Sequence, residues 1–224
     1  MIKKNNFLRE RLTNIVKKSI QNSLNTNGFL KKGLTFEKKT QELIYQLKIR
    51  ISPGKIGELW FCIDFDIVVP PGVSWGFPTN FDIALGGWIT HIDPTYKDKT
   101  WIILKETDQE WEQQDQVAIE WIRKLLTETV LPFFQNIRTL KDVITVLENE
   151  PDSPYEYRFS IPCHGGQAKQ WLAYLYYIIG KKEHAIKILD GQIEFFKSPI
   201  DKIIKKDLEQ LRQQMFFGMN EKTK

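Results

Sequence analysis

The sequence predicts an α+β fold, in which an antiparallel sheet of about five strands packs against long helices and a C-terminal α-helical hairpin follows. Residues 43–51 and 59–69 alternate between apolar and polar side chains, the period-two pattern of half-buried strands. Beyond residue 150 this alternation gives way to helical periodicity. An antiparallel sheet with one face against helices accommodates such strands most simply.

The first element is predicted as an amphipathic helix over residues 7–27, ended by Gly28, which tolerates a left-handed conformation. Short strands are predicted at about residues 33–39, 42–51, 57–69, 81–91 and 100–105. In the third of these strands the apolar side chains from Leu59 to Val69 face the core, and Trp60, Cys62, Asp64 and Asp66 face outward. The segment 70–78 contains three prolines and cannot be a ladder strand.

A second long helix is predicted over residues 109–134, and Pro132 is expected to kink or end it. Thr139 is the expected N-cap of a short helix that follows. The proline-containing segment 150–154 is the clearest candidate linker. We therefore expect an α+β domain over residues 1–150 and a helical extension, packed on that domain, over residues 151–224. Helices are predicted in that extension over residues 167–179, 182–196 and 200–215.

Composition indicates a protein with a sizeable core, since 42% of the 224 residues are hydrophobic, and the net charge is +4. The basic residues near the two ends are interpreted as solvated helix faces: Lys3, Lys4, Arg9, Arg11, Lys17, Lys18, Lys202, Lys205 and Lys206. The two cysteines are too few for a disulfide scaffold. With no apolar stretch long enough to span a membrane, a cytoplasmic location is expected.

The first 150 or so residues contain an opening helix followed by the segment 28–36, then Leu-Pro-Phe-Phe at 131–134 and Thr-Leu-Lys-Asp-Val at 139–143. In the order and spacing of these features they resemble a bacterial family known as domain of unknown function 4304. This resemblance implies helices packed on an antiparallel sheet, and it brings no reaction, cofactor or catalytic residue.

In the C-terminal part, small residues occur at Ala173 and Ala185, an aromatic residue at Tyr176, a turn glycine at Gly180 and an apolar residue at Leu189. At these positions the segment is similar to one tetratricopeptide unit. Because one such unit cannot bury its faces alone, it is expected to pack on the first domain or on a partner.

Two carboxylates are candidates for chemistry. Asp64 and Asp66 lie two residues apart on a strand, hence on one face, where they could share a metal or act as an acid and a base. A polar outer strand face is the simpler interpretation, because no third ligand follows at a motif spacing.

Cys163 and His164 form the second candidate, because a thiolate beside an imidazole at a helix start would be activated. A glycine-containing loop entering a helix is the simpler interpretation.

The other two histidines have simple interpretations: His91 is a turn residue and His184 a surface residue. The common phosphate, dinucleotide, hydrolase and zinc signatures are missing.

The aromatic residues of the strand-rich region suggest binding instead. Exposed tryptophans are enriched where one protein contacts another, and this region contains Trp60, Trp75, Phe77, Trp88 and Trp101. The predicted binding residues are Trp60, Trp75, Phe77, Asp64 and Asp66.

From these observations we expect a non-catalytic cytoplasmic protein-interaction module, in one version an immunity or antitoxin-like protein, with a protein partner and no cofactor, metal or membrane. The alternatives are a metal-dependent hydrolase using Asp64 and Asp66, and nucleic-acid binding through the basic helices, which the charge pattern favours less. The sequence leaves the partner and the oligomeric state open.

Overall fold

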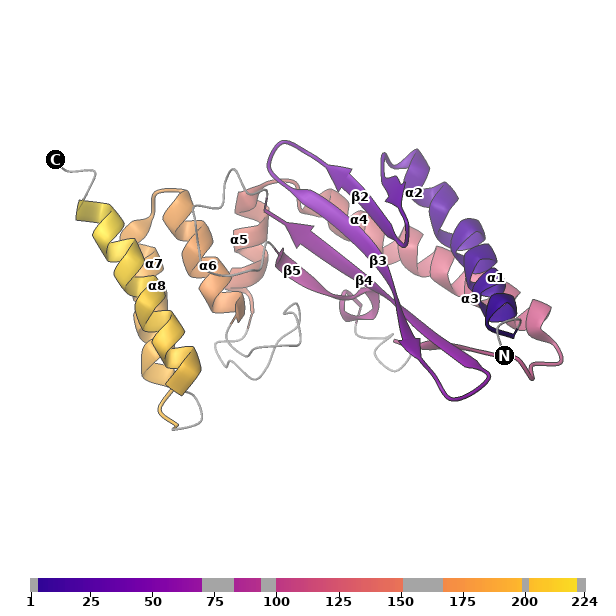
Figure 1. Ribbon diagram of the computed structural model, residues 1–224. Coiled ribbons are helices and arrows are strands. Elements are labelled where there is room, and N and C mark those ends of the chain that lie inside the picture. Colours follow the sequence, from indigo (N-terminus) through magenta and orange to yellow (C-terminus); the bar gives the residue numbers. More distant parts are fainter. Residues whose placement is uncertain (1–3, 70–82, 94–99, 151–166, 199–201, 221–224) are drawn as a thin grey trace. The chain divides into compact units, whose positions relative to one another are not determined.

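The computed structural model describes residues 4–69, 83–93, 100–150, 167–198 and 202–220 (Figure 1). Contacts within the chain divide it into two compact units. The first unit consists of Met1–Ile67 and Gly86–Arg138, and the second unit consists of Val68–Leu85 and Thr139–Lys224. The predicted boundary near residue 150 adjoins a segment outside the described residues, and it stays a prediction.

The N-terminal helix is continuous, as predicted. It runs through α1 (Lys4–Val16), the π-helical turn η1 (Lys17–Gln21) and α2 (Asn22–Thr26). Its apolar stripe is buried at Leu8, Leu12, Ile15, Val16, Ile20 and Leu24. Gly28 follows with a φ of 81°, the left-handed conformation expected of a residue that ends a helix.

Six strands form one sheet, which confirms the predicted fold class. The strands are β1 (Leu30–Lys32), β2 (Thr35–Lys39), β3 (Ile44–Pro53), β4 (Glu58–Val68), β5 (Ile83–Trp88) and β6 (Ile102–Lys105). Their order is β1-β2-β3-β4-β5, and β6 pairs with β4. The pairs β1–β2, β2–β3 and β4–β6 are antiparallel.

The second long helix is built from α3 (Trp111–Leu125), the π-helical turn η4 (Leu126–Val130) and α4 (Leu131–Asn136). Pro132 does not end it at once, because the proline lies in the first turn of α4. There its missing N–H falls where the hydrogen-bond pattern changes from π to α, so the helix continues to Asn136.

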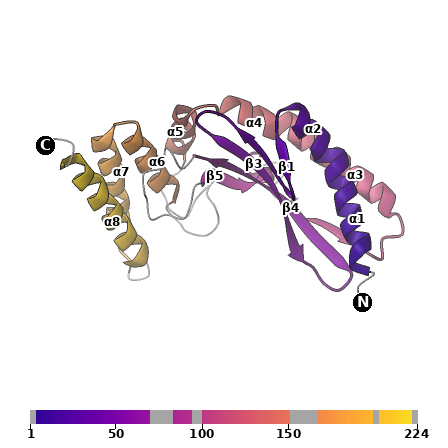
Figure 2. The same cartoon turned by 45° about the horizontal axis from the view of Figure 1, so that its top comes forward.

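These helices cover one face of the sheet, which we call the inner face (Figure 2). Phe65 of β4 lies with its ring centroid 5.5 Å from that of Phe133 and 6.3 Å from that of Phe134. The hydroxyl of Tyr45 donates to the carbonyl oxygen of Ile137 at 2.7 Å. Apolar residues of β3 and β4 thus form the core of this unit with α4.

Arg11 corrects the expectation that all basic residues of the first helix are solvated, because it is buried. Its Nε and Nη2 donate to Asp115 of α3, and its Nη1 donates to the carbonyl oxygen of Lys105 at 2.7 Å. The position explains the burial: Arg11 is three residues after Leu8 and one before Leu12, within the apolar stripe.

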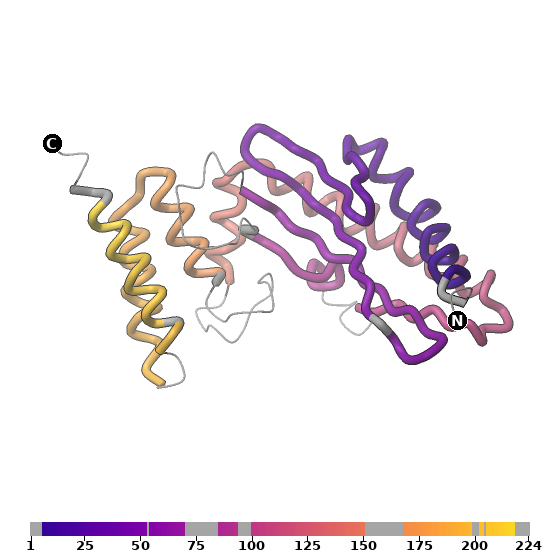
Figure 3. Tube along the Cα trace, viewed as in Figure 1, coloured from indigo at the N-terminus to yellow at the C-terminus, as the bar shows by residue number. Residues whose placement is uncertain are grey.

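The second unit contains α5 (Leu140–Glu148), α6 (Gln167–Ile178), α7 (Lys182–Phe195) and α8 (Lys202–Asn220), each packed on the next (Figure 3). Thr139 caps α5 as predicted, in a reciprocal capping box with Asp142. Gly180 turns the chain between α6 and α7 with a φ of 86°. Ala173, Ala185 and Leu189 are fully buried, but the tetratricopeptide resemblance itself stays a prediction.

Candidate interaction surface

The sheet face opposite α1 and α3, here the outer face, carries alternate residues of β1 to β4 and β6. Antiparallel register places Thr35 opposite Lys48, Glu58 opposite Lys105, and Trp60 opposite Ile103. Residues that are directly opposite lie on the same face of a sheet. The outer face therefore brings together β3, β4 and β6 residues that lie far apart in the sequence.

Asp64 and Asp66 lie on this face, and both are buried. The polar outer strand face expected from the sequence agrees with this position, and both side chains are in addition buried. Each carboxylate meets a cation from β3: Asp64 pairs with Arg50, and Lys48 Nζ lies 2.7 Å from Asp66 Oδ2. Opposite charges on neighbouring strands stabilise such a pair, and each aspartate has its own cation.

The surroundings of Asp64 raise its pKa, chiefly because burial disfavours the charged form, while Arg50 acts in the opposite direction. Cys62 Sγ lies 3.6 Å from Asp64 Oδ1 and donates to it. Burial, together with the charge of Asp64, raises the pKa of Cys62 to about 12. The thiol is therefore protonated at neutral pH, which lowers its reactivity.

The same arrangement of charges extends along the sheet. Glu37 is paired with Lys32 and Lys39, and Glu58 with Lys105 at 3.7 Å. In the five ion pairs of this face, the acidic side chains are 4–17% exposed and the basic ones 31–66% exposed. The outer face thus presents its positive groups to solvent and keeps its carboxylates beneath them.

Beside these ion pairs lies a group of large apolar side chains, which we call the Trp60 cluster: Trp60, Trp101 and Ile103. Trp60 is directly opposite Ile103, which is 40% exposed, and Trp101 is 38% exposed. Trp101 directly precedes β6, two residues before Ile103, so continuing the alternation of that strand places it on the same face. Neighbouring exposed apolar residues of this size mark interaction sites.

Trp60 is the half-buried member of the cluster and is held in place by its neighbours. Its Nε1 donates to Glu58 Oε2 at 2.9 Å. The indole lies against the backbone of Gly54, where a Cβ would be only 2.6 Å from Trp60 Cδ1. A glycine in this turn therefore allows the tryptophan to pack flat against it.

Three of the five predicted binding residues, Trp60, Asp64 and Asp66, lie on the outer face of β4. Trp75 and Phe77 lie outside the described residues, as do Cys163 and His164. Sequence reasoning did not select Ile103. The alternation of residues 101–105 was the available signal, but it becomes informative only with the register against β4.

The two histidines in the described part of the chain contact aromatic rings. His91 ends the 3-10 turn η2 (Ile89–His91), and its ring centroid lies 5.0 Å from that of Trp88. His184 is exposed on α7, 4.4 Å from the ring centroid of Tyr176. Among the described residues, no three His, Cys, Asp or Glu side chains come together as a metal site.

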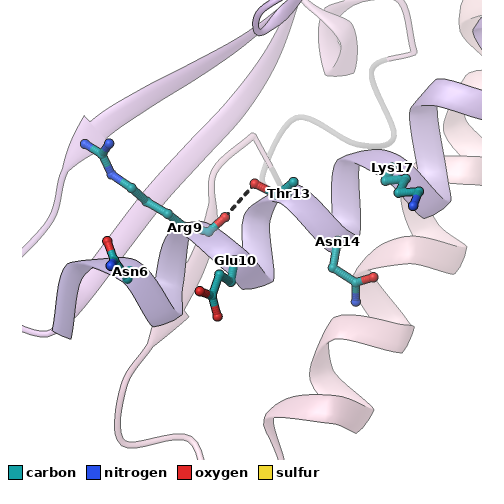
Figure 4. A pocket seen from close by; sticks show the side chains of 6 residues that line it. All are labelled: Asn6, Arg9, Glu10, Thr13, Asn14 and Lys17. Carbon is teal, nitrogen blue, oxygen red and sulfur yellow. Dashed lines mark hydrogen bonds between the residues drawn. The ribbon is translucent and has the colours of Figure 1, made fainter. Parts of the chain in front are cut away.

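A shallow hollow lies on the exposed side of α1 (Figure 4). Its lining side chains all come from this one helix: Asn6, Arg9, Glu10, Thr13, Asn14 and Lys17. Side chains from a single helix cannot surround a ligand, so this hollow is a solvated helix face.

The fold and this surface define an α+β protein whose antiparallel sheet is covered by helices on one face and presents paired charges and tryptophans on the other. In the described part of the chain no helix has the length and apolarity needed to cross a membrane. No family model, curated protein or solved structure matches the chain. The resemblance to domain of unknown function 4304 stays a prediction.

Proposed function

We propose that this protein is a non-catalytic interaction module that binds another protein through the Trp60 cluster. The observation that supports this function is the exposure of Trp101 and Ile103 beside the half-buried Trp60. Trp60 is fixed by Glu58 and Gly54, so little side-chain freedom is lost when a partner covers it. An immunity or antitoxin-like role is the specific version of this proposal, and it rests on analogy of fold.

The rival hydrolase function has less support. It requires Asp64 and Asp66 to act on one ligand, whereas each is paired with its own cation. The adjacent Cys62 thiol is neutral at physiological pH, because its pKa is raised to about 12. Nucleic-acid binding through the first helix loses one of its cations, since Arg11 is buried against Asp115.

The experiment is an affinity pull-down from the native host, read by quantitative mass spectrometry, with the tagged full chain as bait. The test variant is Ile103→Ser, and the matched control is Val117→Ser, which replaces an exposed apolar residue of α3 outside the outer face. We expect a protein that wild type and Val117→Ser retain and that Ile103→Ser retains at least tenfold less.

A Trp75→Ala bait tests the second predicted binding residue in the same experiment. Circular dichroism confirms that each variant is folded. Retention of the same proteins by Ile103→Ser and wild type would contradict the proposal, and so would the absence of any protein above background.

A further inference from the structure

We infer that the partner surface is acidic, with an apolar centre that covers the Trp60 cluster and carboxylates that meet Arg50 and Lys105. This inference rests on the proposed function and adds the chemistry of the partner to it. It is carried by the orientation of the ion pairs on the outer face.

The first step concerns which end of each ion pair a partner would meet. Asp64 is 5% exposed and Arg50 60%; Glu58 is 17% exposed and Lys105 49%. A molecule that approaches this face therefore meets guanidinium and ammonium groups before it meets carboxylates. Complementary charges at the rim of an interface speed association and exclude partners of the wrong sign.

The second step concerns the position of these cations relative to the cluster. Glu58 accepts from Trp60 Nε1 with one carboxylate oxygen and lies 3.7 Å from Lys105 Nζ with the other. Lys105 is thus adjacent to the indole. Arg50 lies on β3 and Lys105 on β6, and both strands pair with β4, the strand that carries Trp60. A strand has two edges, so the two cations lie on the strands to either side of Trp60.

The third step separates an acidic protein from a nucleic acid. Nucleic-acid binding draws its affinity from cations that neutralise phosphates and release counterions. Here every cation of the outer-face ion pairs already has a carboxylate within 4 Å, and Arg50 and Lys48 pair with buried ones. Such pairs can orient a few carboxylates around an apolar centre, but they provide little uncompensated charge for a phosphate backbone. An apolar centre with a charged rim is the anatomy of a protein interface.

The test is selection of a random 16-residue peptide library, displayed on phage, against the immobilised full chain. The readout is the amino-acid composition of peptides enriched by wild type relative to the starting library. We expect at least a twofold excess of Asp and Glu together with large apolar residues. The enrichment is expected to be lost on Ile103→Ser and to weaken when selection is made at high salt.

Charge variants then test the rim directly. Lys105→Gln removes one exposed cation, and the double variant Arg50→Gln/Asp64→Asn removes the other without leaving a buried charge unpaired. Both are expected to abolish the Asp and Glu excess. Lys124→Gln is the matched control, because Lys124 is similarly exposed and is paired with Glu128 on the second long helix, and it should leave the excess unchanged.

The outcomes separate this inference from the proposed function. Enriched peptides that depend on Ile103 but carry no acidic excess would overturn the inference and leave the proposed function standing. If no enrichment depends on Ile103, both fail. A fluorescent 20-nucleotide thymidine strand serves as the nucleic-acid probe, and its binding to wild type with loss on Lys105→Gln would overturn the acidic-protein inference in favour of single-stranded nucleic acid.

Discussion

At the scale of single residues, Asp64 is a buried carboxyl group whose surroundings make the stability of the fold depend on pH. Burial raises its pKa above the ordinary value of 3.8, and the attraction of Arg50 only partly offsets this effect. The unfolded chain therefore loses this proton at a lower pH than the native state does. Between pH 3.8 and the raised native pKa, wild type loses stability as the pH rises.

The substitution Asp64→Asn removes this ionisation and tests the sign. We expect the free energy of unfolding of Asp64→Asn, relative to wild type, to be larger at pH 7 than at pH 4, by about 1.4 kcal/mol for each unit by which the native pKa is raised. Urea titrations of both proteins at pH 4 and pH 7 measure this difference in the free energy of unfolding. Glu128→Gln, which replaces an exposed carboxylate, should show no comparable difference. A smaller advantage at pH 7 than at pH 4 would mean that Arg50 outweighs burial.

The sequence places these residues on a face but does not say what covers the face. Alternation in residues 59–69 correctly predicts that Trp60, Asp64 and Asp66 share the outer face of β4. It cannot predict that Asp64 and Asp66 are buried, because a period-two pattern reports side-chain direction and not the layer above it. Arg11 was misinterpreted for a related reason, since its charge was given more weight than its position on the apolar stripe.

At the scale of elements, Arg11 and Asp115 join α1 to α3. The guanidinium group makes a two-point contact with Asp115 and also binds the carbonyl oxygen of Lys105 in β6. The rings of Phe7 and Trp111 lie 5.8 and 5.6 Å from the guanidinium carbon. The charge is buried, and its polar partners and the two rings replace the water it has lost.

Removing one partner of this pair is expected to be costly. Asp115→Ala should lower the free energy of unfolding by about 3 kcal/mol, because it removes the two-point contact of the buried guanidinium and leaves Asp108, 3.2 Å from Nη1, as its remaining carboxylate. The double variant Arg11→Met/Asp115→Leu should recover most of this loss, since apolar residues of similar size often replace a buried pair at little cost. Denaturant unfolding measures the free energy of unfolding of both variants. Glu112→Ala, on the exposed side of α3, is the control. A double variant as unstable as the single one would show that the fold requires the charges themselves.

Elements with a strong periodic pattern were predicted well. The helix that begins with α1 and the strands β3 and β4 follow from regular spacing of apolar residues over many positions. The second long helix was predicted to end at about residue 134, near Pro132, and it ends at Asn136; how far a helix continues past a proline depends on where the proline lies in the hydrogen-bond ladder. The Trp60 cluster could not be predicted as a unit, since it depends on the register of β6 against β4.

At the scale of the whole molecule, the chain divides into two compact units, and each has buried residues of its own. In the first unit these include Phe36, Phe61 and Phe65, and in the second Ala173 and Leu189. The division passes through β4 and β5, at Ile67/Val68 and at Leu85/Gly86. Composition predicted enough apolar material for one or two cores but could not assign it, because assignment depends on contacts between distant segments.

If most stabilising contacts lie within each unit, the two units should open separately, and native-state hydrogen exchange can detect this. Thr139→Ala removes the capping box of α5 and should destabilise the second unit by about 1 kcal/mol, which is roughly a fivefold loss of amide protection in α5 to α7. Amides of α1 and α3 should keep their protection in this variant. Asp115→Ala should do the reverse, lowering protection in α1, α3 and β6 while α6 and α7 are unaffected. Equal losses throughout the chain in both variants would mean that the two units unfold as one cooperative body, because the strands through which the division passes then transmit the destabilisation from one unit to the other.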